Sequence, residues 1–179
     1  AVIRTLRADP RLAPNFVSWR TLPAEPARHA SWPAGLDPAI VQAIRAHGID
    51  APFTHQAAAI VAALAGRDQV IVTPTASGKT LCYTAPVLQG IREDPQTRAL
   101  YLFPTKALAQ DQLNELHALV TEADLGVRVC TYDGDTSPNA RRAVRTAGHV
   151  VITNPDMLHS GILPHHTKWV RRSEEHTSE

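Results

Sequence analysis

A junction between a predicted strand and a predicted helix carries the sequence TPTASGKT at residues 73–80. Backbone N–H groups from Ala76 to Thr80 can converge there on phosphate oxygens, because a helix N-terminus presents free donors and a positive dipole. In the P-loop pattern, Lys79 neutralises the β- and γ-phosphates and Thr80 offers its hydroxyl to Mg²⁺. Thr73 stands where the first glycine of that pattern is usual. An ordinary strand-to-helix turn is the alternative, and Gly-Lys-Thr at the junction favours a nucleotide site. The residues assigned to it are Thr75, Ala76, Ser77, Gly78, Lys79 and Thr80.

A second candidate contact with the nucleotide precedes the P-loop strand by about one helix, in the sequence Phe53-Thr54-His55-Gln56. A glutamine can pair with the N6/N7 edge of adenine through two hydrogen bonds. Taken alone, Gln56 is equally well a first-turn helix residue. With a P-loop following it, adenine recognition is the better interpretation. The expected cofactors are therefore ATP and Mg²⁺, with Phe53 and Gln56 on the base side.

Small polar residues also follow three later predicted strands. Thr105 and the free N–H groups of a new helix can hold a nucleic-acid phosphate, with Lys106 adding positive charge. Residues 132–136 and 153–156 lie at the carboxyl ends of strands, where open α/β sheets bind ligands. Each stretch alone is more often a capped helix or a loop. The candidate nucleic-acid contacts are Pro104, Thr105, Lys106, Gly134, Asp135, Thr153 and Asn154.

Apolar, β-branched runs alternate with amphipathic segments through most of the chain. The apolar runs predict buried strands at 69–73, 99–103, 127–131 and 149–153. Helices are predicted at 37–48 (opened by Asp37 and Pro38), 54–64 (capped by Thr54), 78–88, 105–120, 138–146 and 155–160. Strands that are apolar throughout and separated by helices predict an α/β fold, with a parallel sheet covered on both faces.

The composition is typical of globular proteins, with 44% hydrophobic residues, 20% charged residues and a net charge of +1. That charge neither requires nor excludes a polyanionic partner. No apolar run approaches the ~20 residues of a membrane helix. Cys82 and Cys130 have no metal-ligand spacing, which favours a reducing cytoplasm, and the histidines near the end of the chain lack the ligand set of a zinc site. Residues 1–35 carry five prolines and no persistent period, so we expect an extended arm.

Several of these motifs together resemble a known family. Gln56, TPTASGKT, PTKALAQ, YDGDT and TNPDML occur in the order and spacing of the Q motif and motifs I, Ia, the GG-type loop and Ib of superfamily-two helicases. Residues 132–136, 141–142, 153–159 and 161–169 are similar to those of bacterial MrfA/YprA-type DEAD/DEAH-box DNA helicases. The resemblance covers roughly residues 28–171.

The resemblance implies a RecA-like P-loop NTPase domain in an ATP-dependent DNA helicase that moves 3′ to 5′ along a single strand. It assigns Lys79 and Thr80 to ATP and Mg²⁺, and Gln56 to adenine. The residues that would face the strand backbone are Thr105, Lys106, Gly134, Thr153 and Asn154. Contacts to the backbone without base readout suit a motor that moves on any sequence.

Hydrolysis also requires carboxylates that hold Mg²⁺ and orient water. Helicases of this type supply them in a D-E-x-H strand after motif Ib, and no apolar run ending in Asp-Glu occurs in this sequence. We therefore expect residues 36–171 to form an incomplete first RecA-like domain that hydrolyses no ATP alone. The second RecA-like domain of the same chain, which would complete the motor, is then missing.

The end of the sequence differs in character from the rest. Residues 172–179, RSEEHTSE, contain no apolar residue and resemble the in-frame translation of a common sequencing adapter. We expect this stretch to be a non-native tail, the alternative being an ordinary charged tail.

Two other function classes remain open at this stage. A P-loop kinase of small molecules would be complete near this length, but it would need an arginine-bearing lid and would not need Gln56 or PTKALAQ. A non-catalytic nucleotide- or nucleic-acid-binding module is the third possibility.

Overall fold

The computed structural model describes residues 2–18, 20–21, 23, 26–74 and 77–169 of the 179-residue chain. Thr75 and Ala76 of the predicted phosphate site and the expected tail at 172–179 lie outside the described residues. Among the described helices, none combines the length and apolar character needed to cross a membrane.

A parallel sheet lies at the centre of the fold. Its strands are β1 (Ala99–Leu102), β2 (Val129–Thr131) and β3 (Val150–Thr153), in the order β1-β3-β2. Both pairings are parallel, and Val151 of β3 lies opposite Leu100 on one side and Cys130 on the other. All four residues of β3 are buried, and successive side chains of a strand point to opposite faces. The predicted parallel sheet is confirmed for these three strands, and both of its faces are covered at β3, whereas Leu100 and Leu102 of β1 are exposed.

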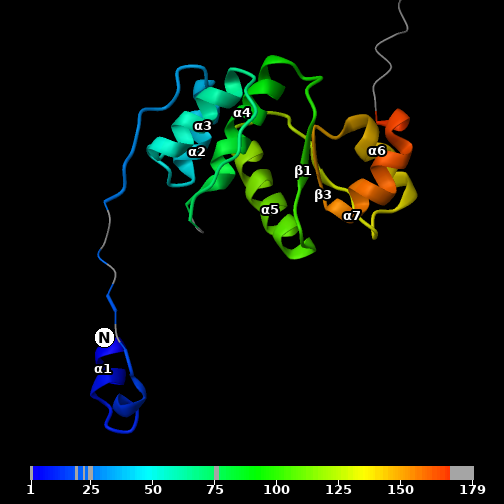
Figure 1. Ribbon diagram of the computed structural model, residues 1–179. Coiled ribbons are helices and arrows are strands. Elements are labelled where there is room, and N and C mark those ends of the chain that lie inside the picture. Colours follow the sequence, from blue (N-terminus) through cyan, green and yellow to red (C-terminus); the bar gives the residue numbers. More distant parts are fainter. Residues whose placement is uncertain (1, 19, 22, 24–25, 75–76, 170–179) are drawn as a thin grey trace, which may run out of the picture.

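Helices lie on both sides of this sheet (Figure 1). One group consists of α2 (Pro38–Ala46), α3 (Thr54–Leu64), α4 (Lys79–Glu93) and α5 (Lys106–Glu122). The other consists of α6 (Pro138–Ala147), the short α7 (Pro155–Met157), the π-helical turn η2 (Leu158–Ile162) and the 3₁₀ turn η3 (Leu163–Lys168). From α4 onward these positions confirm the predicted alternation of strands and helices, and α4 extends past its predicted end at residue 88.

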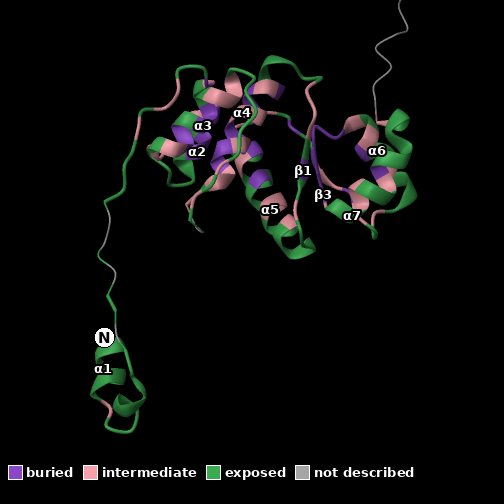
Figure 2. Cartoon of the chain, in the orientation of Figure 1, coloured by how far each residue is buried: buried purple, intermediate pink, exposed green. Residues whose placement is uncertain are grey.

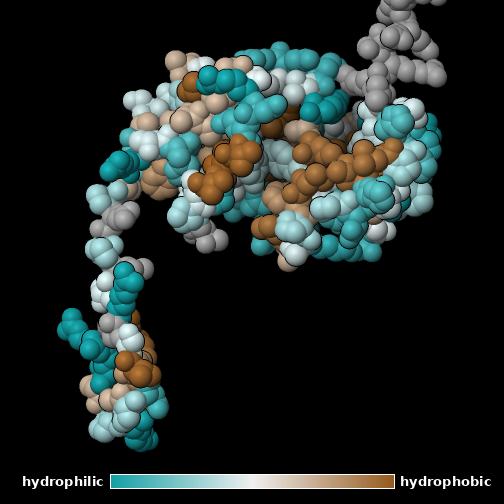
Figure 3. All heavy atoms as spheres, in the orientation of Figure 1, coloured by the Kyte–Doolittle hydropathy of each residue, from teal (hydrophilic) through white to brown (hydrophobic). Residues whose placement is uncertain are grey.

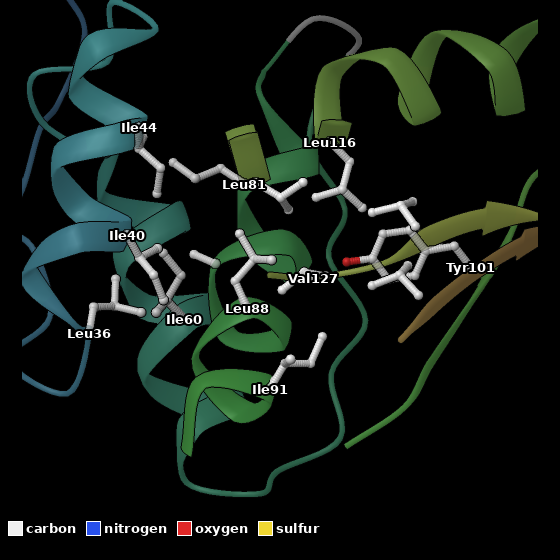
Figure 4. Packing of buried hydrophobic residues seen from close by; sticks show 14 of the residues in the cluster. Leu36, Ile40, Ile44, Ile60, Leu81, Leu88, Ile91, Tyr101, Leu116 and Val127 are labelled. Carbon is white, nitrogen blue, oxygen red and sulfur yellow. The ribbon is translucent and has the colours of Figure 1, made fainter. Parts of the chain in front are cut away.

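Two hydrophobic clusters fill the space between these layers. Val150 and Ile152 of β3 belong to the larger cluster, with residues of α2, α3, α4 and α5. Figure 2 marks the buried residues along the chain, and Figure 4 shows the side chains of this cluster. Val151 belongs to the smaller cluster, with Tyr132, Val144 and Ile162. Alternate residues of one strand therefore join the two helical layers to a common sheet.

The predicted strand at 69–73 is wrong: residues 69–74 form no strand. Val70 and Val72 are 91% and 87% exposed, whereas Ile71 and Thr73 are half-buried. A β-branched run favours extended backbone locally, but a strand also needs a neighbour to complete its hydrogen-bond ladder. No described strand pairs with this segment, so Val70 and Val72 remain on the surface. Figure 3 shows apolar atoms, in brown, exposed near the middle of one face of the molecule.

The N-terminal region is not uniformly extended. A short helix, α1 (Val2–Ala8), and a 3₁₀ turn, η1 (Ala13–Asn15), lie apart from the sheet (Figure 1). Nearer the body, Ala30 N donates to Pro52 O and Thr54 N donates to Arg28 O, both at 2.9 Å, around an antiparallel bridge between His29 and Phe53. The packed body therefore begins near residue 28, several residues before the predicted end of the arm.

Candidate nucleotide and nucleic-acid site

The described part of the P-loop, Ser77 to Thr80, leads directly into α4. Gly78 is the N-cap residue of this helix, and no side chain of the described residues caps it. Because the first turn of a helix has N–H groups without intrahelical partners, the start of α4 has donors to offer a ligand. Ser77, Gly78, Lys79 and Thr80 thus lie together, as the sequence predicted.

Gly78 occupies a position that only glycine fits. Its φ of +70° is left-handed, a region that residues with a Cβ atom rarely adopt. A Cβ atom placed there would also lie 2.5 Å from Gln56 Nε2. The backbone of the loop can therefore approach α3 closely, which fixes where the loop enters α4.

The Lys79 ammonium lies across its own loop. Its Nζ donates to Pro74 O at 2.8 Å, to Thr73 O at 3.0 Å and, at longer distances, to the hydroxyls of Thr73 and Ser77. All four acceptors are neutral oxygens, and none of the described carboxylates pairs with this lysine. The positive charge is therefore available to an anion that reaches the loop.

The first turn of α3 holds the P-loop in place. Gln56 Oε1 accepts from Phe53 N at 2.7 Å, so Phe53, rather than the predicted Thr54, is the N-cap residue. Gln56 Nε2 donates to Gly78 O at 2.8 Å, and His55 Nε2 lies 3.1 Å from Ser77 O. Gln56 is 3% exposed, and its two hydrogen bonds give it two structural roles. The bond to Phe53 N makes it a first-turn helix residue, which was the alternative to adenine recognition, and the bond to Gly78 O supports the P-loop.

A hollow of about 620 Å³ opens beside this turn. The Phe53 ring forms part of its lining and stacks with His55 at a centroid distance of 5.8 Å. Arg28 lines the same hollow, placed there by the pairing of residues 28–30 with 52–54. Sequence reasoning did not identify Arg28 or His55, because their proximity to the loop depends on contacts distant in sequence.

Gln112 of α5 also contacts the phosphate side of the site. The Thr80 hydroxyl donates to Gln112 Oε1 at 3.3 Å, and the Tyr83 hydroxyl donates to the same oxygen at 2.9 Å. Sequence reasoning missed this residue, because it lies 32 positions from Thr80 inside an amphipathic helix.

The candidate nucleic-acid contacts gather around a second cavity, of about 370 Å³, at the carboxyl ends of the strands. Its lining residues include Thr105, Lys106, Asp135, Thr153 and Asn154. The other two candidates, Pro104 and Gly134, are exposed but do not line it. The topology therefore brings together residues that are up to 49 positions apart, from Thr105 to Asn154.

Most polar side chains of this cavity already have partners in the protein. The Thr105 hydroxyl accepts from Leu108 N at 3.3 Å and caps α5, while Asn154 Oδ1 accepts from Met157 N at 2.8 Å and caps α7. Thr153 is 3% exposed, and its hydroxyl donates to Tyr132 O. These contacts match the helix-cap alternative, and they leave the backbone groups and Lys106 to meet a ligand.

Lys106 forms an ion pair with Asp135 at the mouth of this cavity. Both groups are well exposed, and the contact lowers the pKa of Asp135 and raises the pKa of Lys106. A phosphate at Lys106 would therefore compete with a carboxylate for the same ammonium.

Arg141 of α6 fixes the loop that carries Asp135. Its guanidinium donates to Thr136 O at 2.8 Å and to Asp133 O at 3.1 Å, and it lies 5.4 Å from the centre of the Tyr132 ring. The conformation of this loop thus depends on the Arg141 side chain. No spacing pattern in the sequence indicates that role.

A P-loop that enters a helix beside a parallel sheet, with ligand-accessible strand ends, defines a RecA-like α/β nucleotide-binding domain. The DEAD/DEAH box helicase model matches residues 53–177, and the chain belongs to that family. It is 55% identical over 156 residues to the ATP-dependent helicase YprA of Bacillus subtilis, covering 87% of this chain and 21% of that protein. It is 36% identical over 170 residues to the ATP-dependent helicase HRQ1 of Saccharomyces cerevisiae, covering 94% of this chain and 16% of that one.

Solved structures give the same family assignment. A crystal structure of the DUF1998 helicase MrfA bound to DNA matches with a TM-score of 0.84 and 52% identity, over 94% of this chain and 23% of that chain. A second MrfA structure, bound to DNA and AMPPNP, matches with a TM-score of 0.81 and 55% identity, over 86% of this chain and 22% of that one. This chain thus spans about a fifth of the length of these relatives.

Proposed function

We propose that this chain forms the nucleotide-binding part of an ATP-dependent DNA helicase. The observation that carries the proposal is the P-loop at the start of α4, which Gln56 and His55 hold in place. The chain's family supports the reaction class. The relatives bound to DNA and to AMPPNP support DNA and an adenine nucleotide as ligands.

The described residues fit a nucleotide with Mg²⁺. Lys79 presents a charge that no described carboxylate neutralises, and the start of α4 offers N–H groups to a ligand. Gly78 lets the loop pack closely against Gln56. In this proposal Lys79 binds the β- and γ-phosphates, Thr80 binds Mg²⁺ and Gln56 contacts adenine. Mg²⁺, when bound, neutralises charge on the phosphates.

The DNA strand would lie along the carboxyl ends of the strands. Lys106 and the N–H groups at the start of α5 are suited to phosphate oxygens, which allow binding without reading the bases. Thr153 and Asn154 would support this surface: Thr153 donates to Tyr132 O next to the end of β2, and Asn154 caps α7. In this proposal the helicase moves from 3′ to 5′ along the single strand, as the helicase type that the sequence resembles implies.

The test is ATP turnover by the whole helicase that carries this sequence, measured with and without single-stranded DNA. Stimulation by DNA is the expected result. Phosphorylation of a small acceptor, with no response to DNA, would instead establish the kinase alternative. Nucleotide binding with no turnover under either condition would establish the non-catalytic module.

A further inference from the structure

Gln112 lies in α5 and faces the first turns of α4. Its Oε1 atom accepts hydrogen bonds from the Thr80 hydroxyl at 3.3 Å and from the Tyr83 hydroxyl at 2.9 Å. Its Nε2 atom donates to Glu115 Oε2 at 2.9 Å, within the same helix. One amide side chain therefore joins the P-loop helix to the helix that begins at the strand-end cavity.

The orientation of this amide follows from its partners. An ionised carboxylate only accepts hydrogen bonds, so the side of the amide that faces Glu115 must be the NH₂ group. The carbonyl oxygen then faces the two hydroxyls, each of which has a proton to donate. The Tyr83 hydroxyl has one proton and donates it to this oxygen at 2.9 Å.

This arrangement sets the direction of the Thr80 hydroxyl proton. A threonine hydroxyl has one proton and two acceptor lone pairs. Because the proton is directed to Gln112, the lone pairs are left for a group on the P-loop side. A hydroxyl that coordinates a cation needs this arrangement, since a proton pointing at the cation would oppose binding.

We propose that Gln112 is a positioning residue for the metal site. It holds the Thr80 hydroxyl with its lone pairs toward the loop, so that Mg²⁺ meets an oriented ligand. The proposal rests on the proposed function, since it assumes that Thr80 binds Mg²⁺ with the nucleotide.

The surroundings of Gln112 support a defined position for its side chain. Tyr83 packs edge-on against Tyr101 of β1 at a centroid distance of 5.1 Å, and this contact holds the second donor in place. A cavity of about 370 Å³ next to Gln112, Thr80 and Tyr101 leaves room for a shape-matched substitution. Gln112→Leu therefore removes the acceptor with little change in side-chain volume.

The experiment measures the affinity of the whole helicase for AMPPNP, with excess Mg²⁺ and again in EDTA. Gln112→Leu should lose about three- to tenfold of the affinity measured with Mg²⁺, the range for one hydrogen bond. The affinity in EDTA should stay within about twofold, because the phosphate contacts of Lys79 do not involve Gln112. Tyr83→Phe is the comparison variant: it removes the other donor to Gln112 Oε1 and the side-chain hydrogen bond between Tyr83 and Thr80. Because it keeps the bond from Thr80 to Gln112, its loss of affinity with Mg²⁺ should be smaller than that of Gln112→Leu.

A double-mutant cycle separates positioning from general destabilisation. In a Thr80→Ala background, which lacks the hydroxyl, Gln112→Leu should have no further effect on the affinity with Mg²⁺. An equal loss with and without Mg²⁺, an unchanged affinity with Mg²⁺, or an additive loss in the Thr80→Ala background would each overturn the proposal. If the unmodified helicase itself shows no Mg²⁺-dependent nucleotide binding, the proposed function fails first, and that outcome is distinguishable from failure of Gln112 alone.

Discussion

The cavity at the strand ends is lined by polar side chains that already have hydrogen-bond partners. Thr105 and Asn154 cap helices, Thr153 donates to a backbone oxygen, and Lys106 is paired with Asp135. The P-loop differs from this cavity in its backbone conformation and in the partners of its lysine. Gly78 has a left-handed backbone, Lys79 contacts neutral oxygens, and the segment leading into the loop has no strand beside it among the described residues.

This difference indicates how each region responds to a ligand. The strand-end cavity is ordered by internal contacts, so a ligand there must compete with existing partners. The P-loop is held from one side by α3, and its charge and helix N-terminus remain available. Substitutions at the P-loop should therefore affect binding strongly, and substitutions at the strand-end cavity should change it by small amounts in either direction.

The largest expected effect concerns the stability of the 179-residue chain on its own. Val70 and Val72 are exposed in the unpaired segment, and Leu100 and Leu102 of β1 are 43% and 44% exposed. Burying one such side chain contributes about 1.5–3 kcal/mol, so leaving these on the surface rivals the ~5–15 kcal/mol that stabilises a domain. We expect this chain alone to be molten or aggregated, as judged by dye binding and calorimetry.

Two sets of valine substitutions test whether exposed apolar side chains cause the aggregation. Val70→Thr together with Val72→Thr should reduce aggregation, because both side chains are exposed, whereas Val150→Thr in the buried central strand should abolish what structure remains. A sharp, reversible thermal transition from a monomer of the unsubstituted chain would contradict this prediction.

The second effect concerns the P-loop lysine. Lys79→Ala in the whole helicase should remove at least ~3 kcal/mol of transition-state stabilisation, on the order of 100-fold in turnover, because the transferred phosphoryl group loses a fixed positive charge. Steady-state ATP turnover measures this loss. Lys106→Ala is the matched lysine control and should weaken DNA stimulation with less effect on turnover without DNA. Near-normal turnover of the Lys79 variant would argue against the P-loop assignment.

A third, smaller effect separates the two roles of Gln56. Gln56→Ala should weaken ATP binding by about 1–3 kcal/mol if the side chain contacts adenine, and it should weaken GTP binding much less. The bond to Gly78 O adds a loss of about 0.5–1.5 kcal/mol that both nucleotides share. Titration with each nucleotide measures the difference, and His55→Ala provides a control that loosens the loop without removing the amide. Equal losses of affinity for ATP and GTP would mean that Gln56 only supports the P-loop and does not contact adenine.

The smallest effect is expected at the ion pair of the strand-end cavity. Asp135→Asn should strengthen binding of labelled single-stranded DNA roughly two- to fivefold at low salt, because Lys106 loses a competing partner. Asp111→Asn makes the same change in net charge on an exposed part of α5 and should have less effect. Unchanged or weaker binding by the Asp135 variant would contradict the competition.

The pH dependence of the same pair follows from the lowered pKa of Asp135. The Asp135 carboxylate is ionised and paired with Lys106 at neutral pH and down to the ordinary pKa of an aspartate. The ion pair is lost only as the pH falls through the lowered pKa. Acidification should therefore bring the DNA affinity of the unsubstituted protein toward that of the Asp135 variant. Parallel affinity curves for the two proteins down to acidic pH would rule out the pair as the cause.

The sequence predicted those features that depend on local residue type. The apolar run 149–153 became the buried central strand, and Asp37 caps α2 by accepting from Ala39 N at 2.8 Å. The run 69–73 has the same local preference, yet it forms no strand, because pairing depends on a neighbour that local sequence cannot specify. The helix α1 was missed because Val2–Ala8 is short and its apolar residues are exposed.

The candidate sites show the same limit. Ser77 to Thr80 were found because the P-loop motif is contiguous, whereas Gln112 and Arg141 act across 32 and 8 positions through contacts that no spacing pattern indicates. Topology brings five of the seven strand-end candidates to one cavity, and Pro104 and Gly134 do not line it. Their side-chain roles as helix caps became visible once hydrogen-bond partners were known.

The pairing of residues 28–30 with residues 52–54 has a consequence for proteolysis. Trypsin cleaves after arginine and needs an extended, accessible backbone at the scissile bond. The carbonyl of Arg28 accepts from Thr54 N at 2.9 Å, which holds that bond against the body, whereas Arg20 has no backbone hydrogen bond to any part of the chain that the structure describes. A protease should therefore remove the N-terminal region at Arg20 long before it cuts at Arg28, and the surviving core should retain Arg28 and the hollow that it lines.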